Sequence, residues 1–271
     1  MLKLIKFIFL GIIQGITEPI PVSSSGHLLI FQKLLNSSSH IDYNILAILT
    51  NFGSFLAIVI IYRKKICELI VSFFSYLKTK ENKYYSNYKY CWLIVIGTIP
   101  AGIMGLVVTK FGLFDFLEKN IKFVGLTLLI TALFLFLIKD FKGKKNGKEI
   151  TFKDALVIGL FQVVALLPGI SRSGSTIVGG MFRNLKRETA FDFSFMLYIP
   201  ITLATMIIGI KDLLKANLDS IQLLFYFISV VVAFIFTYIA TKWFRSLVKE
   251  GKLIYFVYYC LIVGTLVILF L

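Results

Sequence analysis

Six uninterrupted apolar runs constrain this chain most strongly, because each is long enough to cross the hydrocarbon core of a bilayer, which takes about 17 to 25 residues. Of the 271 residues, 58% are hydrophobic and only 16% are charged, a balance far from that of a soluble domain. The sequence therefore predicts an all-α, polytopic membrane protein. The six runs cover residues 45–62, 90–109, 121–138, 193–210, 221–241 and 253–271.

Two other apolar segments, residues 7–16 and 155–167, are shorter than a span and end in polar turns that contain proline. Each is expected to enter the membrane and turn back, which is tolerated only where the irregular backbone is buried in protein or lines a wet cavity. A third segment, residues 66–77, is amphipathic and is predicted to lie at the membrane interface.

The first polar turn lies within residues 14–28, which read QGITEPIPVSSSGHL. Gln14 and Glu18 are four residues apart, so on a helix they share a face. Pro19 and Pro21 then end that helix, because proline cannot continue the hydrogen-bond ladder and restricts the residue before it. The stretch therefore predicts a helix that breaks just after a carboxylate.

A second short helix is predicted after the prolines, with Ser23 as its N-cap. Helical spacing then brings His27 onto the same side as Ser23 and Ser24. Polar and ionisable groups are costly in apolar surroundings unless they have partners, and inside a membrane they usually serve function. We therefore interpret this break as one half of a functional site.

The second polar turn, residues 168–176, reads PGISRSGST and contains the one arginine that lies deep in an apolar context, Arg172. An arginine at mid-membrane costs about 2.5 to 3.5 kcal/mol on insertion scales, and its guanidinium matches phosphate oxygens in a bidentate way. Gly174 allows close approach of the backbone to an anion at a helix start. The neighbouring hydroxyls are those of Ser171, Ser173 and Thr176. This composition predicts a phosphate cradle.

Two other interpretations stay open. Arg172 could serve only to pair with Glu18 and hold the two halves of the chain together. Serine and glycine are also common packing residues in membrane helices.

The two turns are related by an internal repeat with an offset of 148 residues. The matching pairs are Gly11 with Gly159, Gln14 with Gln162, Ser23 with Ser171, Ser25 with Ser173 and Gly26 with Gly174. Three spans between the copies would turn the second copy upside down. We therefore expect a single membrane domain, 1–271, of two inverted repeats, each with one re-entrant broken helix and three transmembrane helices. Repeat one is about 1–138, a cytoplasmic loop 139–153, and repeat two about 154–271.

The basic residues support this topology. The formal net charge is +15, and 20 of the 29 lysines and arginines, with Arg172 set aside, lie in loops 63–89, 139–189 and 242–252, which the topology assigns to one side. That asymmetry predicts a cytoplasmic location for these loops and excludes nucleic acid as the reason for the charge. The two polar turns then meet around a central pocket. The three cysteines are scattered, so neither a disulfide framework nor a metal site made of cysteine is expected.

Both turns resemble the two signature motifs of the undecaprenyl-diphosphate phosphatases, the bacitracin-resistance family of bacterial membrane enzymes. The phrase FSFMLYIP at residues 193–200 resembles that family as well. The resemblance implies hydrolysis of undecaprenyl diphosphate to undecaprenyl phosphate and phosphate with a divalent cation, magnesium or calcium. That reaction recycles the lipid carrier for peptidoglycan synthesis, cell wall biogenesis and cell shape, and confers antibiotic resistance.

The expected location is the bacterial inner membrane, with multiple passes and an active site that faces outward. The expected partners are a polyprenyl diphosphate and membrane lipids, with no nucleic acid. A homodimer is left open.

The resemblance also implies roles for single residues. The expected catalytic residues are Glu18, Ser24, His27 and Arg172, with Glu18 also the expected metal ligand. The expected substrate-binding residues are Gln14, Ser23, Ser171 and Thr176 from the resemblance, together with Ser25, Ser173 and Gly174 from the composition of the two turns. Two positions depart from the family pattern: Pro19 stands where an aromatic residue is usual, and Cys260 stands where an arginine is expected.

The chemistry leaves two routes for the nucleophile. Glu18 could activate a water molecule, or the hydroxyl of Ser24 could attack after proton removal by His27 or Glu18. A second class of function also stays open, because inverted repeats with broken helices are the usual build of transporters. The alternative function is therefore a transporter or flippase of a phosphorylated lipid or anion.

Overall fold

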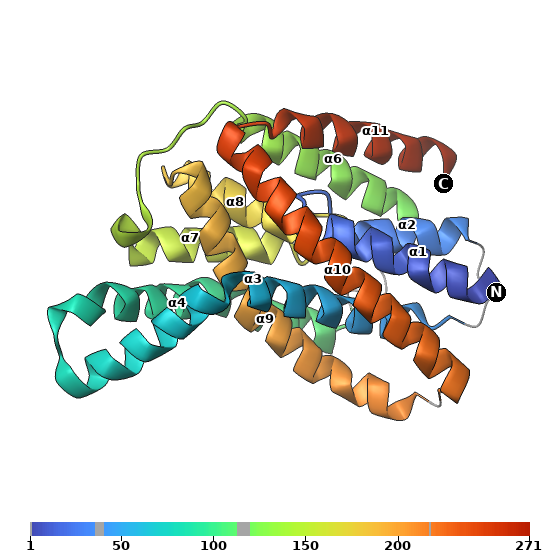
Figure 1. Cartoon of the computed structure of the whole chain (residues 1–271). Coiled ribbons are helices and arrows are strands. Elements are labelled where there is room, and N and C mark those ends of the chain that lie inside the picture. Colours follow the sequence, from blue (N-terminus) through green and yellow to red (C-terminus); the bar gives the residue numbers. More distant parts are fainter. Residues whose placement is uncertain (1, 36–40, 113–119, 217) are drawn as a thin grey trace.

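The structure is a computed structural model that describes residues 2–35, 41–112, 120–216 and 218–271. These residues form α-helices joined by turns, with one short 3-10 helix (Figure 1), so the predicted all-α architecture is confirmed. The elements are α1 Leu2–Thr17, α2 Ser24–Leu34, α3 Tyr43–Thr79, α4 Asn82–Lys110, α6 Ile121–Ile138, η1 Gly147–Glu149, α7 Phe152–Val164, α8 Arg172–Phe182, α9 Arg187–Lys215, α10 Ser220–Glu250 and α11 Ile254–Phe270.

Among the described residues, five helices are long and apolar enough to cross a membrane, namely α3, α4, α6, α9 and α10. The sixth predicted span is α11, an apolar helix of 17 residues. In Figure 1, α6 and α11 run side by side, while α10 crosses the molecule beside α1. The chain is therefore a membrane protein with several transmembrane helices.

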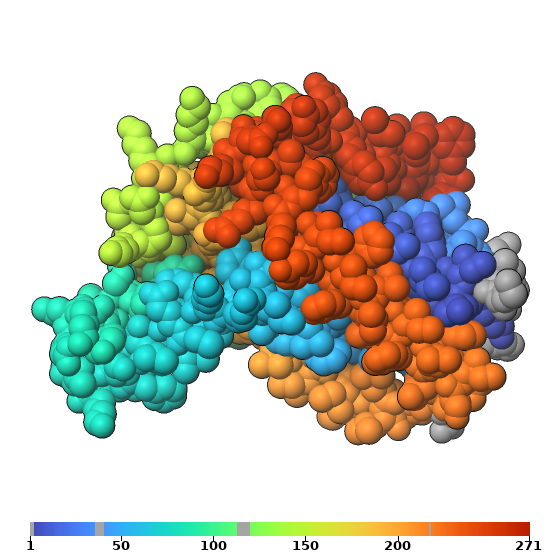
Figure 2. Space-filling model, in the orientation of Figure 1, coloured from blue at the N-terminus to red at the C-terminus, as the bar shows by residue number. Residues whose placement is uncertain are grey.

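Helix α3 contains the amphipathic segment 66–77. It runs unbroken for 37 residues, so segment 66–77 continues the membrane-spanning helix and is not a separate helix. Its location at the membrane interface stays a prediction. At 1.5 Å per residue this helix is about 55 Å long, well beyond a hydrocarbon core of about 30 Å. Part of the segment faces protein: Phe73 and Tyr76 lie against Tyr88 of α4, with ring centroids 5.2 and 4.5 Å apart, whereas Ile70 and Phe74 are exposed. The resulting α3–α4 hairpin stands out from the body of the molecule at the lower left of Figure 2.

Both predicted helix breaks are present, and both use the same cap. Helix α1 ends at Thr17, and α2 begins after Ser23, whose Oγ accepts a hydrogen bond from the Gly26 amide at 3.2 Å. Helix α8 begins after Ser171, whose Oγ accepts from the Gly174 amide at 3.1 Å. The equivalent positions of the two repeats therefore carry out the same local task. The upside-down relation of the repeats, and their boundaries, stay predictions.

Glycines bring the broken helices close to their neighbours. A Cβ on Gly11 would lie 2.8 Å from the carbonyl oxygen of Ser229 in α10, and one on Gly159 would lie 2.5 Å from that of Gly97 in α4. These contacts leave no room for a side chain, so α1 and α7 lie directly against the backbone of a spanning helix. The packing interpretation of glycine is correct at these two positions.

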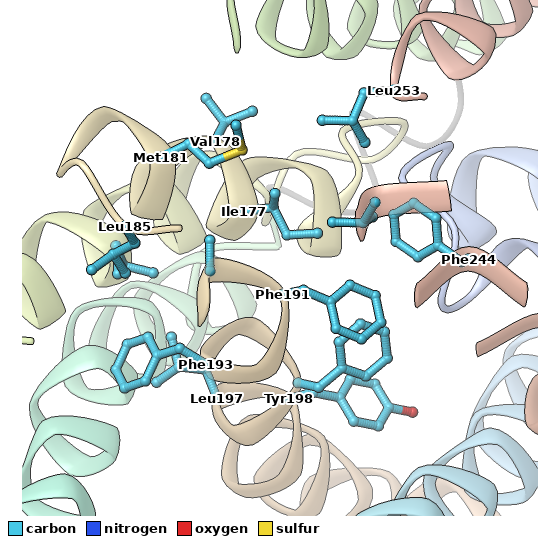
Figure 3. Close-up of a cluster of buried hydrophobic side chains, with 14 of the residues drawn as sticks. Ile177, Val178, Met181, Leu185, Phe191, Phe193, Leu197, Tyr198, Phe244 and Leu253 are labelled. Carbon is cyan, nitrogen blue, oxygen red and sulfur yellow. The ribbon is translucent and has the colours of Figure 1, made fainter. Parts of the chain in front are cut away.

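A cluster of buried apolar side chains fixes α8 against α9 (Figure 3). Ile177, Val178 and Met181 of α8 are each fully buried. Phe191 and Phe193 of α9 are fully buried as well. Because this core lies just beyond the second polar turn, it sets the position from which Arg172 emerges.

A buried carboxylate organises the lysine-rich loop before α7. Asp154 has no exposed side-chain surface and forms ion pairs with Lys145 at 2.9 Å and with Arg183 at 2.8 Å. It also accepts a hydrogen bond from the backbone amide of Thr151 at 3.0 Å, which caps the start of α7. Burial alone would raise the pKa of Asp154, but these hydrogen bonds outweigh it and lower the pKa to about 2.

This carboxylate should make stability depend on acid pH. Since the pKa of Asp154 is lower in the folded protein than its ordinary value of 3.8, its stabilising effect is complete above that value and is lost as the pH falls toward 2. We expect the thermal unfolding temperature of the detergent-solubilised protein to fall across this window. Asp154→Asn should be less stable at pH 6 and should lack this part of the pH dependence. A variant that kept the full dependence would contradict the assignment.

Candidate active site

Glu18 stands at the centre of the two polar turns. Its carboxylate is buried and accepts hydrogen bonds from Gln14 Nε2 at 2.9 Å and from Ser24 Oγ at 2.5 Å. Its other oxygen forms an ion pair with Arg172 Nη2. Gln14 and Glu18 share a helical face, as their spacing predicts. The two turns, 154 residues apart in the chain, therefore meet through an acid and a guanidinium.

Arg172 is held in place by α9 as well. Its Nη1 donates a hydrogen bond to Thr202 Oγ1 at 2.9 Å, and its guanidinium lies over the ring of Tyr198, 4.0 Å from the centroid. The Tyr198 hydroxyl donates in turn to Asn51 Oδ1 at 3.2 Å. The Arg172 side chain nevertheless keeps 25% of its surface exposed, against 5% for Glu18. A ligand can therefore reach the guanidinium without dismantling its supports.

The two turns touch directly through glycine. A Cβ on Gly26 would lie 3.0 Å from Cα of Gly169, and one on Gly174 would lie 3.2 Å from Cβ of Pro21. Gly169 has a φ of +91°, a conformation that side-chain-bearing residues rarely adopt. Each turn thus contributes a glycine where the other approaches, and the starts of α2 and α8 converge.

The predicted serine hydroxyls fall into three groups: exposed, linking the two turns, and capping a helix. Ser24 is partly exposed and Ser25 is exposed, so both can meet a ligand. Ser173 donates to the carbonyl of Ile20 at 3.3 Å, linking the two turns. Ser23 and Ser171 are buried and serve as the helix caps described above.

Thr176 lies apart from the exposed serines. It is 1% exposed, donates to the Arg172 carbonyl at 2.9 Å and shares a hydrogen bond of 2.5 Å with Ser194 of α9. In this state its hydroxyl joins α8 to α9, a position in which contact with a ligand would require rearrangement.

His27 is buried and has two partners. Its Nδ1 lies 2.7 Å from the carbonyl of Ser23, and its Nε2 lies 2.7 Å from the hydroxyl of Tyr259 in α11. Because a carbonyl can only accept, Nδ1 carries the proton in this arrangement. The hydroxyl of Ser24 donates to Glu18. The geometry therefore favours Glu18 over His27 as the group that receives the Ser24 proton.

Several residues at the site were not singled out by the sequence analysis. Thr202, Tyr198 and Asn51 support Arg172, and Tyr259 supports His27. The only sequence signal for these four residues was that each carries a polar atom within an apolar span. Cys260, in place of the expected arginine, is fully buried, and its Sγ lies 3.8 Å from the carbonyl oxygen of Pro21.

The donors suited to a cation are few. No group of three or more histidine, cysteine, aspartate or glutamate side chains that could hold a metal occurs in the described parts of the chain. Glu18 and the amide oxygen of Gln14 could supply two oxygen ligands. Magnesium commonly takes one or two carboxylates and completes its shell with substrate phosphates and water. The residues therefore fit a cation that is bound together with a diphosphate.

The site as a whole offers groups that can bind an anion next to a serine hydroxyl. The N-termini of α2 and α8 carry the positive ends of two helix dipoles, and Arg172 is the first residue of α8. Ser24, the first residue of α2, holds its hydroxyl on the Glu18 carboxylate. This set can bind a phosphoryl group, supply a nucleophile and accept its proton.

Comparison with known proteins identifies the family. A family model described as "Bacitracin resistance protein BacA" matches residues 7–266. "Undecaprenyl-diphosphatase 2" of Bacillus thuringiensis is 42% identical over 269 residues, covering 99% of this chain and 98% of the relative. "Undecaprenyl-diphosphatase 1" of Bacillus licheniformis is 43% identical over 277 residues, covering 99% and 98%. "Undecaprenyl-diphosphatase" of Oceanobacillus iheyensis is 40% identical over 271 residues, covering 99% and 97%. The chain therefore belongs to the bacitracin resistance protein BacA family.

Proposed function

We propose that this protein is a membrane phosphatase that hydrolyses undecaprenyl diphosphate to undecaprenyl phosphate and inorganic phosphate. The observation that carries this function is the contact of Ser24 and Arg172 with one buried carboxylate, Glu18, in a chain whose curated relatives are named undecaprenyl-diphosphatases. A transporter needs the arginine for anion binding, but it has little need of a hydroxyl that is held on a carboxylate. Transport of a phosphorylated lipid stays a separate, untested alternative.

In the mechanism that we propose, the terminal phosphate binds Arg172 and the N-termini of α2 and α8. This exchange frees the Glu18 carboxylate from the guanidinium, so that it can accept the Ser24 proton. The Ser24 oxygen then attacks the terminal phosphorus, the bond from phosphorus to the bridging oxygen breaks, and that oxygen leaves with undecaprenyl phosphate. Water hydrolyses the resulting phosphoserine and releases phosphate.

A divalent cation, magnesium or calcium, is part of the proposal. Glu18 and Gln14 would hold it together with the phosphates, and it would neutralise charge on the transferring group. His27 would act as a positioning residue for α2, since its ring joins the Ser23 carbonyl to Tyr259. The exposed Ser25 and the linking Ser173 would contact phosphate oxygens when the substrate is bound.

The pairing of Glu18 with Arg172 could also be purely structural, and paired substitutions separate the two roles. Glu18→Gln and Arg172→Gln should each lower phosphate release from undecaprenyl diphosphate by at least about 100-fold, the usual effect of removing one electrostatic catalyst. The double variant leaves no unpaired charge, so its thermal unfolding temperature should recover while its activity stays lost. Recovery of activity together with stability would show that the pair only holds the turns together.

Replacing the proposed nucleophile should distinguish the two routes of attack. We expect Ser24→Ala to lower kcat by at least about 1,000-fold, because no hydroxyl remains in line with the phosphorus. The matched variant Ser25→Ala should change mainly KM. A phosphoserine at Ser24, trapped by acid quench and located by mass spectrometry, would identify the covalent intermediate. Retention of activity within about tenfold in Ser24→Ala would instead support water activated by Glu18.

An apolar groove beside the site suits the isoprenoid tail. This cavity of about 480 Å³ lies between α4 and α9. Its lining includes Ile201 and Thr205, which are close in sequence to Thr202, the residue that accepts a hydrogen bond from Arg172. Leu166, just before the second turn, forms part of its wall. Gly102 also lines it, and an added Cβ there would meet nothing within 4 Å. We propose that the isoprenoid tail of the substrate lies along this groove, with the units beyond the first three at Gly102.

Filling the groove should therefore weaken the binding of substrates with a long tail more than that of substrates with a short tail. Gly102→Trp should raise KM for undecaprenyl diphosphate about tenfold, since displacing about two methylene groups from an apolar surface has that effect. KM for farnesyl diphosphate, whose tail is short, should change less. The control is Met104→Trp on the exposed face of the same helix, outside the groove. The proposal would be contradicted if both variants raised KM equally, or if Gly102→Trp raised KM equally for both substrates.

The proposed cellular location follows from the distribution of basic residues. We place the protein in the bacterial inner membrane with its lysine-rich loops in the cytoplasm and its active site facing outward, as the charge asymmetry favours. There it would return the lipid carrier to peptidoglycan synthesis and support resistance to bacitracin. A homodimer stays an open proposal.

A further inference from the structure

A second polar cavity lies on the lysine-rich face of the molecule, away from the proposed active site. It has a volume of about 770 Å³ and is enclosed by α3, α4, α9, the end of α10 and the turn at η1. None of the residues at the Glu18–Arg172 centre lines it. Its basic lining residues are Lys64, Lys65, Lys148 and Arg245, and its acidic ones are Glu68 and Asp192.

The charges in this cavity leave a surplus of cations. Glu68 pairs with Lys65 at 3.5 Å and accepts a hydrogen bond from Asn87 at 2.8 Å. Asp192 is engaged in the same way, with Arg245 at 3.1 Å and the hydroxyl of Tyr62 at 2.9 Å. Both carboxylates are thus neutralised by neighbours.

Two lysines remain once these pairs are counted. Within the described parts of the chain, no ion pair involves Lys64 or Lys148. Both are exposed, and they line the cavity from different elements. Their charge is suited to one anionic group.

An apolar groove adjoins this cavity. It has a volume of about 260 Å³, is lined by side chains of α3, α4 and α9, and shares the wall residue Met196 with the basic cavity. Ile70, Phe74 and Cys91 line it. The exposed fractions of Ile70 and Phe74 are 52% and 65%, so the groove is open to the surroundings of the helices. A basic cavity that shares a wall with an apolar groove matches an anionic headgroup attached to a hydrocarbon chain.

We propose that this combined site binds an anionic glycerophospholipid of the bilayer. Its phosphate would lie between Lys64 and Lys148, and one acyl chain would follow the groove between the α3–α4 hairpin and α9. A phospholipid is favoured because basic residues at a membrane face attract anionic headgroups, which are present there in bulk. The groove borders the α3–α4 hairpin, which stands out in Figure 2.

Lipid titrations on purified protein test this site. The protein, stripped of lipid in detergent, is titrated with phosphatidylglycerol or phosphatidylcholine while binding is followed by native mass spectrometry and by thermal unfolding. We expect phosphatidylglycerol to bind more tightly and to raise the unfolding temperature more. Lys64→Ala combined with Lys148→Ala should weaken that binding about thirtyfold, since each lysine near a lipid phosphate contributes about fivefold. Phosphate release from undecaprenyl diphosphate should stay unchanged.

Two matched controls make the outcome specific. Lys142→Ala combined with Lys144→Ala removes two exposed lysines of the same face that do not line the cavity. Ile70→Asn alters the groove, whereas Val71→Asn alters the neighbouring exposed position outside it. Only the cavity and groove variants should weaken binding.

Three results would overturn the proposal. The first is equal stabilisation by both lipids, and the second is equal weakening by the control variants. The third is binding of undecaprenyl phosphate, but not phosphatidylglycerol, with dependence on Lys64 and Lys148, which would assign the cavity to the polyprenyl lipid instead.

Discussion

The ion pair between Glu18 and Arg172 is the interaction on which the arrangement of the site depends. Each charge alone, at the break of a helix within an apolar chain, would be costly, and removing one partner of a buried pair typically costs about 3 to 5 kcal/mol. Together they join two helix breaks from opposite halves of the chain. The pair is also asymmetric, because Glu18 is buried while a quarter of the Arg172 side chain is exposed. An incoming phosphate can therefore compete for the guanidinium and release the acid.

The surrounding structure holds this pair with repeated, simple devices. A serine caps each short helix, and a glycine in each turn lets the other turn approach. The cluster in Figure 3 then fixes α8 on α9, so that Thr202 and Tyr198 meet the guanidinium. These contacts hold Glu18 and Arg172 in one place between the two turns.

Much of this could be predicted from local pattern. The prolines after Glu18 and the Ser23 cap predicted the first break, and the spacing of Gln14 and Glu18 predicted their shared face. Contacts between distant spans could not be predicted in this way: His27 meets Tyr259 across 232 positions, and no periodicity encodes that pairing. The pattern of segment 66–77 also did not show that it continues the preceding span or that Phe73 and Tyr76 meet Tyr88 of α4, since such contacts depend on the fold of the hairpin.

The most direct test is a structure of the protein with a non-hydrolysable methylene analogue of undecaprenyl diphosphate. We expect the terminal phosphonate oxygens to lie about 3 Å from the Arg172 guanidinium and from the amides that begin α2 and α8, with Ser24 facing phosphorus and the ion pair to Glu18 opened. A diphosphonate bound elsewhere, with the pair between Glu18 and Arg172 intact, would contradict the assignment of this centre as the active site.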